Sequence, residues 1–372
     1  MCIRDRVGIL EGLPLGLPLD VERIDAELIR RQGGYGRGGR MKIEKDRVQV
    51  LSGVRAGETI GSPLALSLVN RDHKIDELPV PTNARPGHAD LAGSQKFGKR
   101  DPRAVLERAS ARETAMRVAL AGAARQVLEA FGVEIFGHLV EFGGQPCGVP
   151  DPDALGQAER GRRRDASEFY CLDETADERL KALVDAAAAD RDTLGGVFEV
   201  RAYGLLPGLG HFASGPQRLT SRLAGALMSI PAMKGVEFGL GFESAGLPGS
   251  RVHDPIRAAR KGEGEGRYAR ESNRSGGLEG GMTTGEPLVV RVAMKPISTL
   301  RRGVPTVDFE SLEPVRATYQ RSDVTAAPAA SVVGEAMVAL CLTEAFFAKF
   351  GGDSLGQISS SVEAYRRELG QI

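Results

Sequence analysis

The chain has 372 residues, enough for one large or two ordinary domains, and its 49 basic side chains balance 49 acidic ones. Bulk charge therefore indicates neither a nucleic acid nor a membrane as partner, and any anion site must come from local clustering. The four cysteines, at positions 2, 147, 171 and 341, show no metal-ligand spacing and no apolar run has the length of a membrane span, so we expect a cytoplasmic protein.

The first elements follow from apolar periodicity and capping residues. From Val7 onward the chain reads as a strand, a Gly/Pro turn and a helix over residues 21–31, which Asp20 caps and Gly33 ends. The segment "MCIRDR" before Val7 does not belong to this pattern. Strands are predicted next, over residues 47–54 and 62–70.

The rest of the chain alternates long helices and strands without a regular βαβ period. A single helix is predicted over residues 101–132, with Asp101 as its cap and Gly132 at its end. Further helices are predicted over 177–191, 219–230 and 331–352, and further strands over 133–144, 195–205 and 285–296. Residues 150–170 and 247–286 are rich in charge or glycine and read as loops. This order favours α+β layers over a doubly wound sheet.

The segment "RRQGGYGRGGRMKIE", residues 30–44, combines arginine with glycine. Glycine lets the backbone approach a ligand, and arginine binds phosphate or carboxylate through a bidentate fork. Three interpretations fit these residues: a polyanion site, an RGG-type RNA-binding segment, or a solvated basic loop.

Two further segments carry candidate site residues. In "RPGHAD", Arg85 and His88 flank a Pro-Gly turn; a lone histidine is more often structural, but a nearby arginine favours a site. In "ERASARET", Arg108, Ser110 and Arg112 make a basic, hydroxyl-rich helix start, which suits an anion as well as it suits a polar helix face.

Three later segments are weaker signals. The double-glycine loop at 273–285 and "KPIST" at 295–299 could together hold a cofactor phosphate, although neither has P-loop spacing. The pair Arg321 and Asp323 precedes the last apolar helix and could equally be a local ion pair. Their sum predicts an arginine-rich pocket with one histidine and one aspartate for proton transfer.

Long motifs in this order resemble those of the chorismate synthase family. The motifs are "RRQGGYGRGGRM", "RPGHAD", "ERASARETAMRVA", "DTLGGVFEV", "GGLEGGMTTG", "KPIST" and "RSD" followed by "EAMVAL", and they agree in spacing from about residue 7 to 354. The resemblance implies a single domain over residues 7–372 with a long flexible loop near 247–272. It implies an α+β fold, a layered sandwich of long helices between antiparallel β-sheets.

The resemblance also implies an activity and an assembly. Members of this family are lyases of the shikimate pathway of aromatic amino acid biosynthesis. They eliminate phosphate from 5-enolpyruvylshikimate 3-phosphate in a 1,4-anti sense to give chorismate. They require reduced FMN (FMNH2), without net redox change, and NADPH serves those members that reduce their own flavin. The implied assembly is a cytoplasmic homotetramer, with no nucleic acid or membrane partner.

Site residues carry over from the family motif by motif. Arginines that hold the substrate's phosphate and carboxylates, or lie beside the flavin, match Arg31, Arg37, Arg40, Arg85, Arg112 and Arg321. His88 matches a histidine that stabilises the anionic reduced flavin, and Asp323 matches an aspartate that relays a proton. The flavin contacts match Arg108, Ala109, Ser110, Pro231, Ala232, Gly280, Lys295, Pro296, Ile297, Ser298, Thr299 and Arg321.

The sequence departs from the family in three places. Thr325 stands where cysteine is common, and Pro231 stands where a polar residue is common and removes an N–H donor. The family's Gly-Glu-Ser-His-Gly turn, which supplies a histidine that protonates the leaving phosphate, has no counterpart before Val7. Residues 1–6 are therefore interpreted as a non-native start, and we expect the chain as printed to fold but to turn over slowly.

Two other functions stand beside this one. The first is a catalytically impaired, FMN-binding remnant of the same fold, which would differ in turnover but not in binding. The second is an RNA-binding protein that uses "GYGRGGR". Balanced charge and 5% aromatic residues count against RNA binding, because single-strand binders need basic grooves and stacking platforms.

Overall fold

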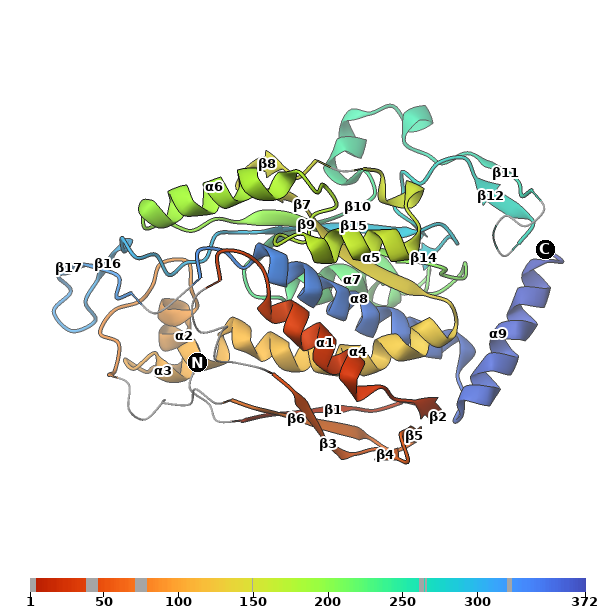
Figure 1. Ribbon diagram of the computed structural model, residues 1–372, viewed down its shortest axis with the longest axis horizontal. Coiled ribbons are helices and arrows are strands. Elements are labelled where there is room, and N and C mark those ends of the chain that lie inside the picture. The colour runs from red at the N-terminus through yellow and green to blue at the C-terminus, as the bar shows by residue number, and fades with distance from the viewer. Residues whose placement is uncertain are drawn as a thin grey trace.

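Two antiparallel sheets enclose a layer of helices, as the ribbon in Figure 1 shows. The computed structural model describes residues 5–37, 46–70, 79–148, 150–260, 264, 266–319 and 323–372. The described chain is therefore an α+β sandwich, as the motifs and the alternation of elements predict.

The first sheet lies below the helices in Figure 1 and has the strand order β1 (Asp5–Leu10), β6 (Leu64–Val69), β3 (Val48–Ser52). Strand β6 alternates, so that Leu64, Leu66 and Leu68 are buried against the helices. Glycine at position 8 lets the helix α4 (Thr114–Ala130) approach β1, since a Cβ at this position would lie 2.6 Å from the Met116 side chain. A smaller sheet beside it pairs β2 (Leu15–Pro18), β5 (Glu58–Ile60) and β4 (Val54–Arg55).

The helical layer consists of α1 (Val21–Gln32), α4 (Thr114–Ala130) and α8 (Ala327–Phe350). Asp20 caps α1 through hydrogen bonds from the N–H groups of Glu22 and Arg23. Small residues let these helices approach closely, because a Cβ on Gly122 would lie 3.2 Å from Ile24. In the described part of the chain α8 is long and apolar enough to span a membrane, but 78% of its most apolar window is buried inside the protein, as in a core helix.

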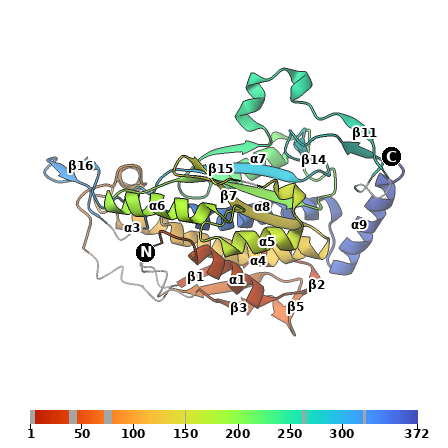
Figure 2. The same ribbon diagram turned by 45° about the horizontal axis from the view of Figure 1, so that its top comes forward.

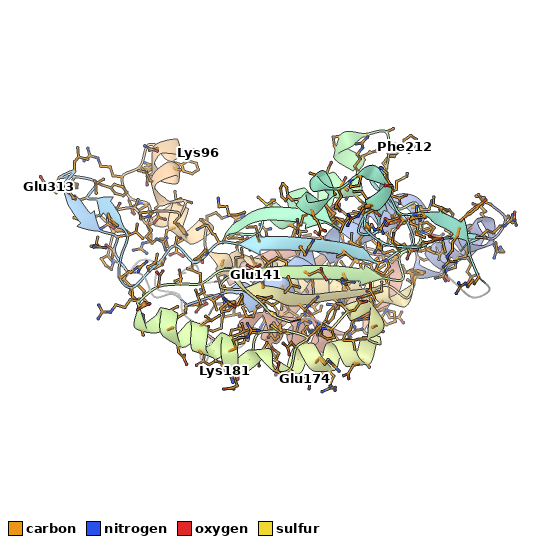
Figure 3. The ribbon with its side chains drawn as sticks, turned by 90° about the horizontal axis from the view of Figure 1, so that it is seen from above. Lys96, Glu141, Glu174, Lys181, Phe212 and Glu313 are labelled. Carbon is orange, nitrogen blue, oxygen red and sulfur yellow. The ribbon has the colours of Figure 1, made fainter. Side chains whose placement is uncertain are left out.

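The second sheet covers the other side of α8 and has the order β10 (Met233–Phe238), β15 (Leu288–Met294), β9 (Gly196–Tyr203), β7 (Glu134–Phe142), β8 (Gln145–Pro146). Its inner face is apolar. Figure 3 views the molecule from above, on the side of the outer face of this sheet. Four residues of the outer face are cross-strand neighbours. In order across the strands they are Glu237, Arg291, Glu199 and His138.

The remaining helices and hairpins surround this core, as Figure 2 also shows. The helices are α2 (Asp90–Phe97), α3 (Arg103–Arg108), α5 (Gln157–Ala166), α6 (Ala176–Ala189), α7 (Leu219–Met228) and α9 (Leu355–Leu369). The hairpins pair β11 (Ile256–Ala258) with β12 (Tyr268–Arg270), β13 (Leu278–Glu279) with β14 (Met282–Thr283), and β16 (Pro305–Val307) with β17 (Pro314–Arg316).

Three element predictions are wrong. The segment 247–286, predicted as a loop, contains the hairpins β11–β12 and β13–β14. The helix predicted over 101–132 is interrupted: α3 ends at Arg108, Ser110 is extended with ψ 135°, and a 3-10 turn (Ala111–Glu113) leads into α4. The segment 150–170, predicted as a loop, contains α5. Its buried positions are Arg160 and Arg164, so it lacks the apolar stripe by which a helix is recognised.

Candidate active site

The turn between β6 and α2 places three ionisable side chains in direct contact. Asp90, the first residue of α2, is 1% exposed and accepts hydrogen bonds from Arg85 Nε at 2.8 Å and Arg85 Nη2 at 3.0 Å. His88 Nδ1 lies 2.5 Å from Asp90 Oδ1. Burial alone would raise the pKa of Asp90, but the hydrogen bonds from His88 and Arg85 hold it well below its usual range. The carboxylate therefore stays ionised.

The loop after β15, residues 295–299, packs against this turn. Arg85 Nη1 donates to Thr299 Oγ1 at 3.0 Å, and Lys295 Nζ donates to the Gly87 carbonyl at 3.0 Å. Burial, with Lys234 nearby, lowers the pKa of Lys295. The sequence segments "RPGHAD" and "KPIST", 210 residues apart, thus form one site.

Backbone contacts connect this loop to the segment after α7. The Lys295 N–H donates to the Ala232 carbonyl at 3.0 Å, and Ala232 has the uncommon φ of +75°. Pro231, whose missing N–H is its departure from the family, directly precedes it. Gly195 fits only as glycine, since a Cβ there would lie 2.4 Å from the Met294 carbonyl oxygen. The flavin-contact candidates 231–232 and 295–299 therefore lie together.

A second group of charges lies where α1 ends beside the start of α4. Arg31 donates from Nε to Thr114 Oγ1 at 3.0 Å and from Nη2 to the Ala111 carbonyl at 3.1 Å. Arg112 makes a bidentate pair with Asp46, and Arg31 Nη1 lies 3.9 Å from the same carboxylate. Arg31, Arg112 and Asp46 are all buried. Two predicted substrate-binding arginines thus share one carboxylate.

The third group joins the glycine-rich segment after α1 to the start of α8. Arg37 Nη1 lies 2.9 Å from Asp323 Oδ2, and Val324 N–H donates to the Gly36 carbonyl at 2.9 Å. Thr325 is fully buried, and its hydroxyl accepts the N–H of Ala327, the first residue of α8, at 3.2 Å.

The "DTLGG" segment joins the third group to the 295–299 loop. Leu194 N–H donates to the Val324 carbonyl at 3.0 Å, and Thr193 Oγ1 donates to the Ile297 carbonyl at 2.7 Å. The 295–299 loop therefore contacts the turn at 85–90 and also Thr193, while Leu194 contacts the segment that follows Asp323.

Not every candidate residue joins these groups. Arg40 and Arg321 lie outside the described residues. Arg108 is 77% exposed in its side chain and lies 3.9 Å from Glu113, whereas Ala109 and Ser110 form the junction before Arg112. The hairpin β13–β14, which holds Gly280 in its turn, lies at the other end of the molecule from α2 and α3 (Figures 1 and 2).

Two carboxylates of these groups were not among the residues selected from the sequence. Asp90 had a signal, since it stands two residues after His88 within "RPGHAD". Asp46 had none: it lies 66 residues before Arg112, and only the fold brings the two together. Together the three groups provide guanidinium, ammonium and hydroxyl donors for a multiply charged anion, with an imidazole and carboxylates for proton transfer.

The family follows from comparison with known proteins. A profile of the chorismate synthase family matches residues 4–347. The chorismate synthase of Geobacter sulfurreducens is 50% identical over 376 aligned residues, which cover 96% of this chain and 94% of that protein. The chain belongs to the chorismate synthase family.

Two further relatives agree with this assignment. The chorismate synthase of Trichlorobacter lovleyi is 51% identical over 376 aligned residues, with the same coverage of 96% and 94%. A crystal structure of chorismate synthase superposes with a TM-score of 0.81 at 38% identity, covering 99% of this chain and 96% of that one. Membership of this family makes the chain an enzyme of the lyase type.

Proposed function

We propose that this chain eliminates phosphate from 5-enolpyruvylshikimate 3-phosphate in a 1,4-anti sense to give chorismate, with reduced FMN as cofactor. The observation that supports the proposal best is the contact between the Arg85–Asp90 turn and the 295–299 loop, in a member of this family. Each segment carries donors for anions, and the turn adds an imidazole.

The arginines fit a substrate that carries a phosphate and two carboxylates. Arg31, Arg37 and Arg112 each lie within 4 Å of a carboxylate, from Asp46 or Asp323, and these partners orient the guanidinium groups. Such pre-oriented cations stabilise negative charge as it develops on a leaving phosphate, at no cost in reorganisation.

The donor set also fits a flavin mononucleotide. Lys295, Ser298 and Thr299 offer one cation and two hydroxyls of the kind that binds a phosphate, and the Ala232 backbone lies beside them. Reduced FMN, when bound, supplies an electron-rich ring system next to the substrate. In this proposal His88 holds a proton on its imidazole close to that ring, and the Asp323 carboxylate takes up or releases a proton.

An anaerobic assay with chemically reduced FMN and 5-enolpyruvylshikimate 3-phosphate tests the function, with chorismate followed by absorbance and phosphate by its release. Arg31→Ala should lower kcat/KM by about 10²-fold, because it removes charge-assisted hydrogen bonds to the substrate. Arg23→Ala is the matched control on the same helix, since Arg23 is 55% exposed in its side chain and pairs with Glu129. Equal losses in the two variants would contradict the proposed site.

The same assay addresses the alternative of an impaired flavin-binding remnant. A chain that binds reduced FMN but forms no chorismate in this assay would support that alternative.

The proposal extends to the assembly and its surroundings. We expect a homotetramer, whose mass light scattering from the purified protein measures directly, and we expect it in the cytoplasm. NADPH joins the cofactors if the protein reduces its own FMN, and anaerobic NADPH oxidation in the presence of FMN tests that activity.

A further inference from the structure

The buried carboxylate of Asp90 is surrounded by hydrogen-bond donors from Arg85 and His88. It accepts the Arg85 N–H at 3.2 Å and Arg85 Nε at 2.8 Å on Oδ2, and Arg85 Nη2 at 3.0 Å on Oδ1. His88 Nδ1 lies 2.5 Å from the same Oδ1. Because Arg85 is itself held by Thr299, the carboxylate has a fixed orientation toward the histidine ring.

The position of the proton between Asp90 and His88 follows from this geometry. Two bare acceptors at 2.5 Å would repel each other, so a proton lies between the nitrogen and the oxygen. Asp90 accepts three hydrogen bonds from Arg85, which favour its ionised form, so the proton belongs to Nδ1. In the neutral ring, Nε2 is then the unprotonated nitrogen.

We propose that Asp90 is a positioning residue that fixes His88 as the Nδ1–H tautomer and so makes Nε2 the nitrogen that exchanges a proton during catalysis. This inference rests on the proposed role of His88. The charged groups in contact with this turn are Arg85 and Asp90 themselves and Lys295, which reaches the Gly87 carbonyl from the 295–299 loop. An ionised carboxylate on Nδ1 also stabilises the imidazolium form when Nε2 takes up a proton.

An asparagine at position 90 should reverse the tautomer. If the amide oxygen of the asparagine takes the place of Oδ2, it still accepts hydrogen bonds from Arg85 Nε and from the Arg85 N–H. The NH₂ group then takes the place of Oδ1 and faces Arg85 Nη2 and His88 Nδ1. The opposite orientation would set the NH₂ against two arginine donors, so the first orientation is preferred. His88 Nδ1 must then accept a hydrogen bond, and the ring proton moves to Nε2.

Magic-angle-spinning NMR of ¹⁵N-histidine-labelled protein reports this directly, with His88 assigned through His88→Gln. The unsubstituted protein should show protonated Nδ1 and bare Nε2 in the neutral ring, and Asp90→Asn should show the reverse. Asp101→Asn is the matched control. Asp101 lies just before α3 and also accepts a backbone N–H, from Arg103 at 2.8 Å. This substitution should leave the His88 spectrum unchanged.

Turnover is the second readout. Asp90→Asn should lower kcat by about 10²-fold or more with a smaller change in KM, and Asp90→Glu should recover part of the loss. Bare Nδ1 in the unsubstituted protein would overturn the inference, and so would a reversed tautomer with full kcat. If the spectra are as expected but the unsubstituted protein forms no chorismate, the assigned tautomer stands and the proposed function fails. Should Asp90→Asn fail to fold, the spectrum of the unsubstituted protein still decides.

Discussion

At the scale of single residues, Arg31, Arg37 and Arg112 each lie within 4 Å of a carboxylate. Asp46 is 3% exposed and forms a bidentate pair with Arg112, while Arg31 lies 3.9 Å away. A buried ion pair is costly to break on one side, because the remaining charge stays desolvated. Asp46 therefore orients the guanidinium groups of Arg31 and Arg112 and offsets the desolvation cost of burying their charge.

Replacement of the Asp46 carboxylate should lower both the stability and the activity of the protein. Asp46→Asn removes the buried carboxylate that pairs with Arg112, so we expect the free energy of unfolding to fall by about 3 kcal/mol. We also expect kcat/KM to fall by about 10-fold as Arg31 and Arg112 lose their orientation. Urea titration and the anaerobic assay measure the two effects. Asp185→Asn removes an exposed carboxylate that accepts from Tyr35 OH, and it should change stability by less than about 1 kcal/mol.

The residue scale also shows what a single sequence can and cannot predict. Arg31, Arg85 and His88 stand in long motifs, and the structure brings Arg85 and His88 into contact. Asp46 carries no such signal, because its carboxylate acquires its role from Arg112, a partner 66 residues distant in sequence. Contacts between residues distant in sequence decide which polar side chains belong to the site, and local sequence composition does not reveal these contacts.

At the scale of elements, apolar periodicity predicted the helices and strands that face the core. The helix α1, its Asp20 cap and its Gly33 end agree with the structure, and so does the central strand β9. Apolar periodicity failed to predict a helix whose buried positions are polar. In α5, Arg160 pairs with Glu134 at 2.5 Å and stacks on Tyr203, a partnership of side chains that no 3.6-residue pattern reveals.

Helix α8 contains a second case of this kind. Glu335 is 2% exposed and accepts from Arg30 Nη2 at 2.5 Å, Arg125 Nη1 at 2.9 Å and the Gly137 N–H at 2.8 Å, with Arg164 Nη1 at 3.4 Å. These contacts tie α8 to α1, α4, α5 and β7. One carboxylate thus connects most of the helical layer to the five-stranded sheet.

Glu335→Gln should therefore destabilise the protein by about 3–5 kcal/mol, because it leaves three guanidinium groups without their shared charge. Glu344→Gln is the matched control on the same helix. Glu344 pairs with Arg222, but its side chain is 70% exposed, and surface pairs contribute about 0–1 kcal/mol. Denaturant midpoints of the two variants separate these cases. Similar shifts would show that the Glu335 network adds no more stability than a surface pair.

At the scale of the whole molecule, buried carboxylates lie on both faces of the five-stranded sheet. Glu335 lies between its inner face and the helices, and Glu199 lies on its outer face in the row with His138 and Arg291. Burial alone would raise both pKa values. The arginines around Glu335 nevertheless lower its pKa from 4.5 to about 2, and His138 and Arg201 do the same for Glu199.

This arrangement sets the direction in which stability depends on pH. Both carboxyl pKa values are lower in the folded than in the unfolded chain, so their contribution is complete above about pH 4.5 and is lost as pH falls toward 2. Each shift corresponds to roughly 3 kcal/mol, so we expect the free energy of unfolding to decrease steeply across this interval. Urea titrations at a series of pH values measure it. Glu335→Gln should remove the Glu335 part of the slope and leave the Glu199 part; an unchanged slope would mean that Glu335 is not the charged centre of the helical layer.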